Sequence, residues 1–134
     1  MTTNEAIDKS LQTQTILVVE DDETSRTALC AMLEALGYGY IAFGDPREVI
    51  EKLAGRPIDL GLLDLMMPYL NGYQLIEKLR EVPQYQTIPL FLITARDTEE
   101  DVLEGYRHGV DYYITKPYTT KQLRYGIELY LGIK

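Results

Sequence analysis

Short apolar stretches alternate with amphipathic stretches five times along the chain. The apolar stretches are rich in Val, Ile and Leu, as strands buried on both faces of a sheet are. They predict five strands, of which the second is the weakest, at residues 15–20, 38–43, 58–64, 88–94 and 111–115. Gly61 lies inside the third strand, where a glycine often marks the close approach of another backbone.

The amphipathic stretches carry apolar residues at helical spacing, so each predicts a helix. We expect helices over about 23–36, 45–54 and 97–108, one that contains 75–79 and ends before residue 83, and a last one that residue 119 or 120 caps. Asp45 and Asp97 are each followed by an acidic residue three positions later, which is typical of a helix N-terminus.

Strands and helices that alternate in this way predict an α/β fold, a parallel sheet with helices on both faces and right-handed crossovers. We therefore expect one doubly wound, five-stranded parallel sheet. The chain of 134 residues has the size of a single domain. We assign residues 15–134 to this domain. Residues 1–14, polar and of mixed charge, form an N-terminal extension that is flexible or a short extra helix.

Four of the expected strands end at, or are directly followed by, polar residues of different chemical kinds: Glu20 and Asp21, then Asp64, Thr94 and Lys116. In such sheets the ligand site lies outside the carboxyl ends of the strands, so these side chains are expected to meet there. Neighbouring carboxylates repel one another, and a hard dication such as Mg²⁺ relieves the repulsion. Asp64 is a candidate nucleophile toward phosphorus, and Thr94 and Lys116 are candidate phosphoryl ligands.

The composition narrows the possible partners and compartments. The formal net charge of -8 argues against sequence-independent binding of nucleic acid, which needs a basic surface. The single cysteine, Cys30, cannot form an internal disulfide; it is expected in the core and fits a reducing, cytoplasmic compartment. The chain has no apolar stretch long enough for a membrane span and no secretory signal.

Four motifs in chain order carry a family resemblance. They are Glu20-Asp21-Asp22, Asp64-Leu65-Met66-Met67-Pro68 with Asn71-Gly72, Thr94-Ala95 and Lys116-Pro117. Together they make residues 15–134 resemble the receiver (CheY-like) domain of two-component response regulators. The resemblance implies the flavodoxin-like fold with strand order 2-1-3-4-5. It also implies a phosphoacceptor signalling domain that catalyses only its own phosphorylation and dephosphorylation, rather than an enzyme with a separate substrate.

The resemblance assigns a role to each matched residue. It makes Asp64 the phosphoacceptor and Thr94 and Lys116 the ligands of the phosphoryl group. It implies that Mg²⁺ is bound directly by Asp21, Asp64 and the backbone carbonyl of Met66, and through a water by Glu20. It also implies a cis peptide bond between Lys116 and Pro117.

Thr94 and Tyr113 match the switch residues of the family, so phosphorylation is expected to draw Thr94 toward the phosphate and to let the Tyr113 ring move inward. The phosphodonor would be a histidine kinase or a histidine phosphotransfer protein. The output surface would comprise the helix at 97–108, the strand at 111–115 and the last helix, and would bind a downstream protein or a second copy. Tyrosines suited to interfaces fall in this region, namely Tyr106, Tyr113, Tyr118, Tyr125 and Tyr130.

Some residues depart from the family pattern. Gly61 replaces a bulky residue in the third strand, and Asn71 replaces a more usual Asp. Met66 and Arg96 stand two positions beyond Asp64 and Thr94, where bulk would hinder an attacking water and prolong the life of the phosphoform. His108, the one histidine, is expected to be a solvated residue at a helix end rather than a relay histidine.

Three further interpretations remain open. Because the last helix runs to the end of the sequence, we expect no output domain: the protein is a free-standing receiver, or a receiver excised from a longer regulator or a hybrid kinase. A phosphohydrolase of the haloacid-dehalogenase type would need a second acid two residues after Asp64, where Met66 stands. A flavodoxin-like cofactor binder would need a hydroxyl-rich loop after the first strand, where residues 20–23 are acidic.

Overall fold

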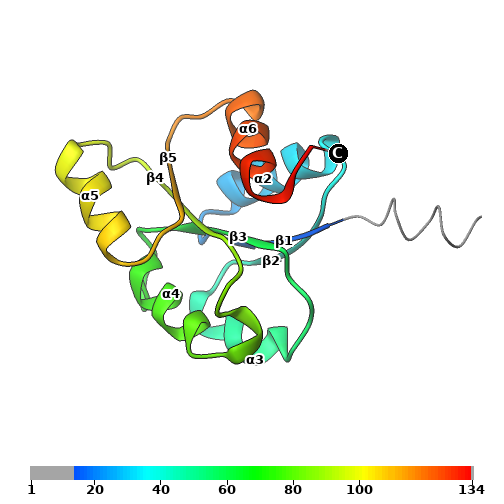
Figure 1. Ribbon diagram of the computed structural model, residues 1–134, viewed down its shortest axis with the longest axis vertical. Helices are drawn as coiled ribbons and strands as arrows, with labels where there is room; N and C mark the ends of the chain where they lie inside the picture. The colour runs from blue at the N-terminus through cyan, green and yellow to red at the C-terminus, as the bar shows by residue number, and fades with distance from the viewer. Residues whose placement is uncertain (1–13, 134) are drawn as a thin grey trace, which may run out of the picture.

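The computed structural model describes residues 14–133, so most of the predicted N-terminal extension lies outside the described residues. Five parallel strands form one sheet in the order β2-β1-β3-β4-β5, which confirms the predicted fold class and strand order (Figure 1). The strands are β1 (Thr15–Val19), β2 (Gly39–Phe43), β3 (Leu60–Asp64), β4 (Leu90–Thr94) and β5 (Tyr112–Thr115). The α-helices are α2 (Glu23–Ala35), α3 (Val49–Leu53), α4 (Gly72–Arg80), α5 (Glu99–Arg107) and α6 (Thr120–Leu131).

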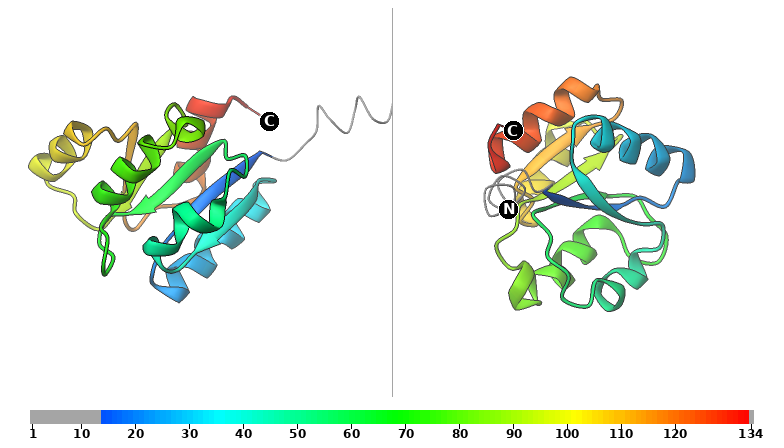
Figure 2. Two further views of the ribbon diagram at one scale, coloured as in Figure 1. Left: turned by 90° about the horizontal axis from the view of Figure 1, so that it is seen from below. Right: turned by 90° about the vertical axis from the view of Figure 1, so that its right-hand side faces the viewer.

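The sheet separates two apolar layers, and Figure 2 shows helices on both sides of it. Successive residues of a strand point to opposite faces, so Leu17 and Val19 pack toward α3 and α4 while Ile16 and Val18 pack toward α2 and α6. All five residues of β3 and of β4 are buried, as strands covered on both faces require. Among residues 14–133, no helix combines the length and apolar character needed to cross a membrane.

Gly61 is explained by packing between neighbouring strands. A Cβ atom at this position would lie 2.7 Å from Cδ2 of Leu90, its register partner in β4. The expected close approach therefore occurs, but the approaching group is the Leu90 side chain rather than another backbone. A bulky residue fits here only if Leu90 moves.

Two helix starts differ from their predictions. Asp45 caps a 3₁₀ turn, η1 (Pro46–Glu48), and its carboxylate accepts the amide of Arg47 instead of forming a capping box with Glu48. The fourth predicted helix begins later than expected, because Thr98 rather than Asp97 is the N-cap and Asp101 completes the box. Two possible capping pairs overlap at this second site, Asp97 with Glu100 and Thr98 with Asp101, and the structure forms the second. A second short 3₁₀ turn, η2 (Pro83–Tyr85), precedes β4.

Candidate functional site

Three carboxylates meet at the carboxyl edge of the sheet, as the strand ends predicted. Glu20 directly follows β1, Asp64 ends the adjacent β3, and Asp21 opens the loop to α2. Carboxylate oxygens of the three side chains lie within 4.8 Å of one another. Glu20 and Asp64 are only 4% and 8% exposed, whereas Asp21 faces solvent. A charged cluster is thus held at the rim of an apolar core.

The electrostatics of this cluster are unfavourable for negative charge. Burial raises the pKa of Glu20, and the neighbouring Asp64 raises it further. Burial and the charge of Glu20 raise the pKa of Asp21. Closely spaced oxygen ligands with an excess of negative charge are the donor set that hard dications prefer. The residues present therefore fit a Mg²⁺ ion.

The ammonium group of Lys116 lies beside two of the acids. Its Nζ lies 2.7 Å from Oε1 of Glu20 and 3.6 Å from Oδ2 of Asp64. Burial alone would lower the pKa of Lys116, but the hydrogen bond to Glu20 and the charge of Asp64 outweigh it and hold this pKa above its usual value. The peptide bond from Lys116 to Pro117 is cis, as predicted.

The loop after β3 is folded tightly around Asp64. The amide of Met66 donates to Oδ1 of Asp64 at 3.2 Å, while the Met66 side chain is exposed. A Cβ atom on Gly72, the first residue of α4, would lie 2.8 Å from the carbonyl oxygen of Asp64. Only a residue without a side chain allows the helix to begin this close to the loop. Tyr69 adopts a left-handed φ of 74°, which is uncommon for a residue other than glycine.

Thr94 and Tyr113 are linked through the backbone of Arg96. Thr94 is fully buried at the end of β4, one residue beyond the register partner of Asp64, and its Oγ1 accepts the Arg96 amide at 3.3 Å. The Tyr113 hydroxyl donates to the Arg96 carbonyl oxygen at 2.8 Å. Burial raises the pKa of Tyr113 to about 12. The two predicted switch residues therefore contact the backbone of the same residue, Thr94 at its amide and Tyr113 at its carbonyl oxygen.

The Tyr113 ring lies directly against α5. A Cβ atom on Gly105 would approach two ring carbons of Tyr113 at 2.8 and 2.9 Å, so Gly105 provides the space for the ring. Gly105 is the one buried residue of α5, which makes this contact central to the attachment of the helix. Sequence reasoning missed Gly105, although an isolated glycine inside a helical pattern was an available signal.

His108 lies at a helix end as predicted, but its side chain is only 33% exposed. Its ring stacks on Tyr73 of α4 with centroids 4.0 Å apart, and its Nε2 lies 2.9 Å from Oε1 of Glu104. The stack joins the C-terminus of α5 to the N-terminus of α4. A contact between residues this far apart in the sequence leaves no local pattern.

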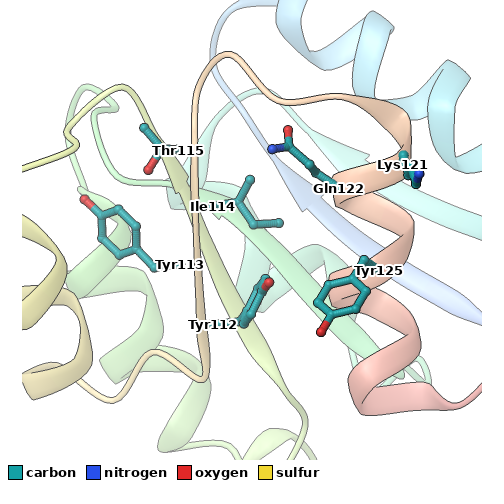
Figure 3. Close-up of a pocket in the computed structure, with 7 residues that line it drawn as sticks. All are labelled: Tyr112, Tyr113, Ile114, Thr115, Lys121, Gln122 and Tyr125. Carbon is teal, nitrogen blue, oxygen red and sulfur yellow. The ribbon is translucent and has the colours of Figure 1, made fainter.

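The surface beside β5 carries aromatic and apolar side chains. A groove of about 430 Å³ runs between β5 and α6, with Tyr113 on one side of the strand and Tyr125 on the helix across it (Figure 3). We define the α5–β5–α6 face by the exposed residues Leu103, Tyr106, Tyr125 and Leu129. Tyr118 does not belong to it, because its ring packs on the core layer beneath α2 and α6.

The profile of the response regulator receiver domain matches residues 16–128. The phosphate regulon transcriptional regulatory protein PhoB of Escherichia coli (strain K12) is 39% identical over 108 residues, which cover 81% of this chain and 47% of PhoB. The transcriptional regulatory protein RprY of Bacteroides fragilis (strain YCH46) is 35% identical over 116 residues, covering 87% and 48%. The chain thus spans about half the length of the curated relatives it matches.

Solved structures agree with this comparison. The receiver domain of a sensor histidine kinase from Pseudomonas aeruginosa PAO1 superimposes with a TM-score of 0.82 at 26% identity, over 90% of this chain and 99% of that one. That receiver has a magnesium ion coordinated in its active-site cleft.

Proposed function

The chain belongs to the response regulator receiver family, and on this basis we propose that Asp64 accepts a phosphoryl group from a phosphohistidine. The donor would be a sensor histidine kinase or a histidine phosphotransfer protein, as the resemblance implied. The observation that carries the proposal is the clustering of Asp64 with two further acids and with Lys116 at one edge of the sheet. The signal would leave through the α5–β5–α6 face.

The proposed chemistry is a displacement at phosphorus. An oxygen of Asp64 attacks and forms the P–O bond of an acyl phosphate, while the P–N bond breaks and the imidazole leaves with its electron pair. The Lys116 ammonium, 3.6 Å from Oδ2 of Asp64, offsets the charge gathered around the acceptor. The Thr94 hydroxyl would donate to a phosphoryl oxygen after giving up the Arg96 amide.

The acidic residues supply the rest of the proposed site. Asp21, Asp64 and the Met66 carbonyl would hold Mg²⁺ directly and Glu20 would act through a water. When bound, Mg²⁺ supplies positive charge to neutralise the phosphoryl oxygens. The donors to Glu20 support its indirect role, because both of its oxygens already accept hydrogen bonds, from Lys116 and from the Asp22 amide.

The proposed switch runs from Thr94 to Tyr113 through Arg96. If Thr94 turns toward a phosphoryl group, its contact with the Arg96 amide is lost and the loop that carries the Arg96 carbonyl is free to move. The Tyr113 hydroxyl binds this carbonyl, so the loop and the ring would move together. The ring rests on Gly105, which extends the effect to α5.

The composition of the α5–β5–α6 face supports a protein partner. Aromatic side chains such as Tyr106 and Tyr125 combine apolar area with a polar tip, which is typical of interfaces. The first turn of α5 is acidic, whereas α6 carries the exposed basic residues Lys121 and Arg124. In a two-fold pair the acidic helix of one copy would face the basic helix of the other, so a second copy is a candidate partner beside a downstream protein.

The first experiment is incubation with Mg²⁺ and phosphoramidate, followed by intact mass measurement, with Asp64→Asn as the control. We expect one added phosphoryl group in the wild type and none in the variant. A wild type that stays unmodified while folded and loaded with Mg²⁺ would refute the proposal. Multiple turnover of a phosphomonoester would instead revive the phosphohydrolase interpretation.

A further inference from the structure

We infer that Arg26 is a positioning residue for the metal-binding acids, acting through the backbone that carries Glu20 and Asp21. The inference rests on the proposed function, since it concerns the same Mg²⁺ site. Arg26 lies in the first two turns of α2, and no sequence motif assigned it a role. The structure instead folds its side chain back over the carboxyl end of β1.

The guanidinium of Arg26 donates hydrogen bonds to the backbone carbonyls of Glu20 and Asp21. Nη1 of Arg26 donates to the carbonyl oxygen of Glu20 at 2.8 Å and lies within hydrogen-bond distance, 3.3 Å, of the carbonyl oxygen of Asp21. The carbonyls of Glu20 and Asp21 belong to the two peptide planes that flank the Cα of Asp21, so holding both restrains the backbone angles of Asp21 and the direction of its side chain. The planar guanidinium is a rigid donor, so it restrains this turn more tightly than a flexible ammonium would.

Gly44 provides the space in which the guanidinium lies. A Cβ atom on Gly44 would come within 2.8 Å of Nη1 and 3.2 Å of Cζ of Arg26. The φ of Gly44 lies outside the left-handed region, so the backbone there accepts other residues and the space is what requires glycine. Gly44 follows β2 directly, and the last residue of β2, Phe43, accepts the amide of Glu20 at 3.1 Å. The guanidinium thus bridges the ends of β1 and β2.

Two roles for Arg26 predict opposite effects on Mg²⁺ binding. As a nearby positive charge it would weaken cation binding, and its removal would tighten it. As a positioning group it keeps the acids aligned, and its displacement would weaken binding. When a group that hydrogen-bonds to metal ligands and orients them is lost, metal affinity falls about 10–100-fold. Variants that keep the charge but move the guanidinium separate the two roles.

The structure offers two such variants. Gly44→Ala retains Arg26 and pushes its guanidinium aside, and Arg26→Lys retains the charge without the planar fork. Arg56→Met is the matched control for an arginine, because this exposed residue precedes β3 at the opposite edge of the sheet. Arg26→Met removes both the charge and the donor.

The test is the dissociation constant of Mg²⁺, measured by calorimetry on the full chain, with circular dichroism to verify folding. We expect Gly44→Ala and Arg26→Lys to weaken Mg²⁺ binding about tenfold and Arg56→Met to leave it unchanged. Phosphorylation by phosphoramidate should return to the wild-type rate in both variants at saturating Mg²⁺, as an effect confined to affinity requires. If Gly44→Ala does not fold, Arg26→Lys still decides the question.

Unchanged or tighter Mg²⁺ binding in the folded variants would overturn the inference, as would a wild type that binds no Mg²⁺. A slower rate that persists at saturating Mg²⁺ would also overturn it, because the role would then not be confined to the metal site. If the wild type binds Mg²⁺ but takes up no phosphoryl group, the proposed function fails, while the measured affinities still decide the role of Arg26.

Discussion

Neutralising Asp21 should stabilise the protein in the absence of Mg²⁺ and abolish its stabilisation by Mg²⁺. Asp21 is the exposed member of a triad whose carboxylate oxygens lie within 4.8 Å of one another. Asn has nearly the same size as Asp, so Asp21→Asn removes the charge with little change in packing. The change in the free energy of unfolding therefore measures the electrostatic repulsion between Asp21 and the other two carboxylates.

The magnitude follows from the spacing of the carboxylates. Two unit charges at this distance repel by about 0.9 kcal/mol in water and about 3.5 kcal/mol at an effective dielectric constant of 20. Because Asp21 faces solvent, the lower figure applies to each of its two neighbours, and Lys116 offsets part of it. We expect the free energy of unfolding without Mg²⁺ to rise by about 1 kcal/mol.

Urea unfolding in EDTA and in excess Mg²⁺ measures both effects. Wild-type stability should rise with the Mg²⁺ concentration as mass action requires, whereas that of Asp21→Asn should stay nearly flat. Glu77→Gln removes one exposed negative charge from α4, away from the triad, and serves as the control. It should change stability little and respond to Mg²⁺ like the wild type.

The pH dependence provides a second check. Burial and the charge of Glu20 raise the pKa of Asp21, so the folded state holds this proton more tightly than the unfolded state does. Stability without Mg²⁺ should therefore fall as the pH rises from the ordinary value of 3.8 through the folded value, and the loss should persist above it. The gain from Asp21→Asn should accordingly be largest at neutral pH and vanish in acid. An Asn variant that is less stable than the wild type in EDTA at neutral pH would refute this reasoning.

Other contacts give further predictions. Gly105→Ala should displace the Tyr113 ring, which would destabilise the protein by about 1 kcal/mol in urea unfolding and lower the pKa of Tyr113 from about 12. Ultraviolet titration measures this pKa, and an unchanged value would contradict the prediction. Tyr69→Gly should relieve the left-handed φ and be about 1 kcal/mol more stable than Tyr69→Ala, which keeps that cost, in thermal unfolding; equal stabilities would count against strain. Met66→Asn and Arg96→Ala should each speed loss of the phosphoryl group about tenfold, or ~1.4 kcal/mol of barrier, in a time course of intact mass; unaltered rates would exclude the proposed shielding.

The sequence predicted that the site residues cluster because they stand where apolar runs stop. Glu20, Asp64 and Thr94 each mark the end of a buried strand, and parallel strands bring their carboxyl ends to one edge. The acidic cluster and its contact with Lys116 follow from this register. The strand order came from the family resemblance, since alternating strands and helices alone allow several orders.

Features that depend on side chains from distant segments escaped prediction. Arg26 is a polar residue of a helix, and its packing against Gly44, 18 positions later in the sequence, follows from no local pattern. The stack of His108 on Tyr73 joins two helices that are far apart in the sequence, so no local sequence pattern predicts this contact. Helix starts differed for another reason: the Asp45 carboxylate accepts the amide two residues on, whereas a capping box requires the amide three residues on.

The donors around the two buried acids restrain them to different degrees. Glu20 is held on both oxygens and buried, so it has little freedom to approach a cation and is suited to bind through a water. Asp64 is restrained on Oδ1 by the Met66 amide, while its Oδ2 faces Lys116 at 3.6 Å, beyond hydrogen-bond distance. That oxygen keeps lone pairs available for an incoming phosphorus or a cation. The backbone amides and Lys116 thus hold the two buried acids together against their repulsion, and Oδ2 of Asp64 is the oxygen that we propose as the phosphoryl acceptor.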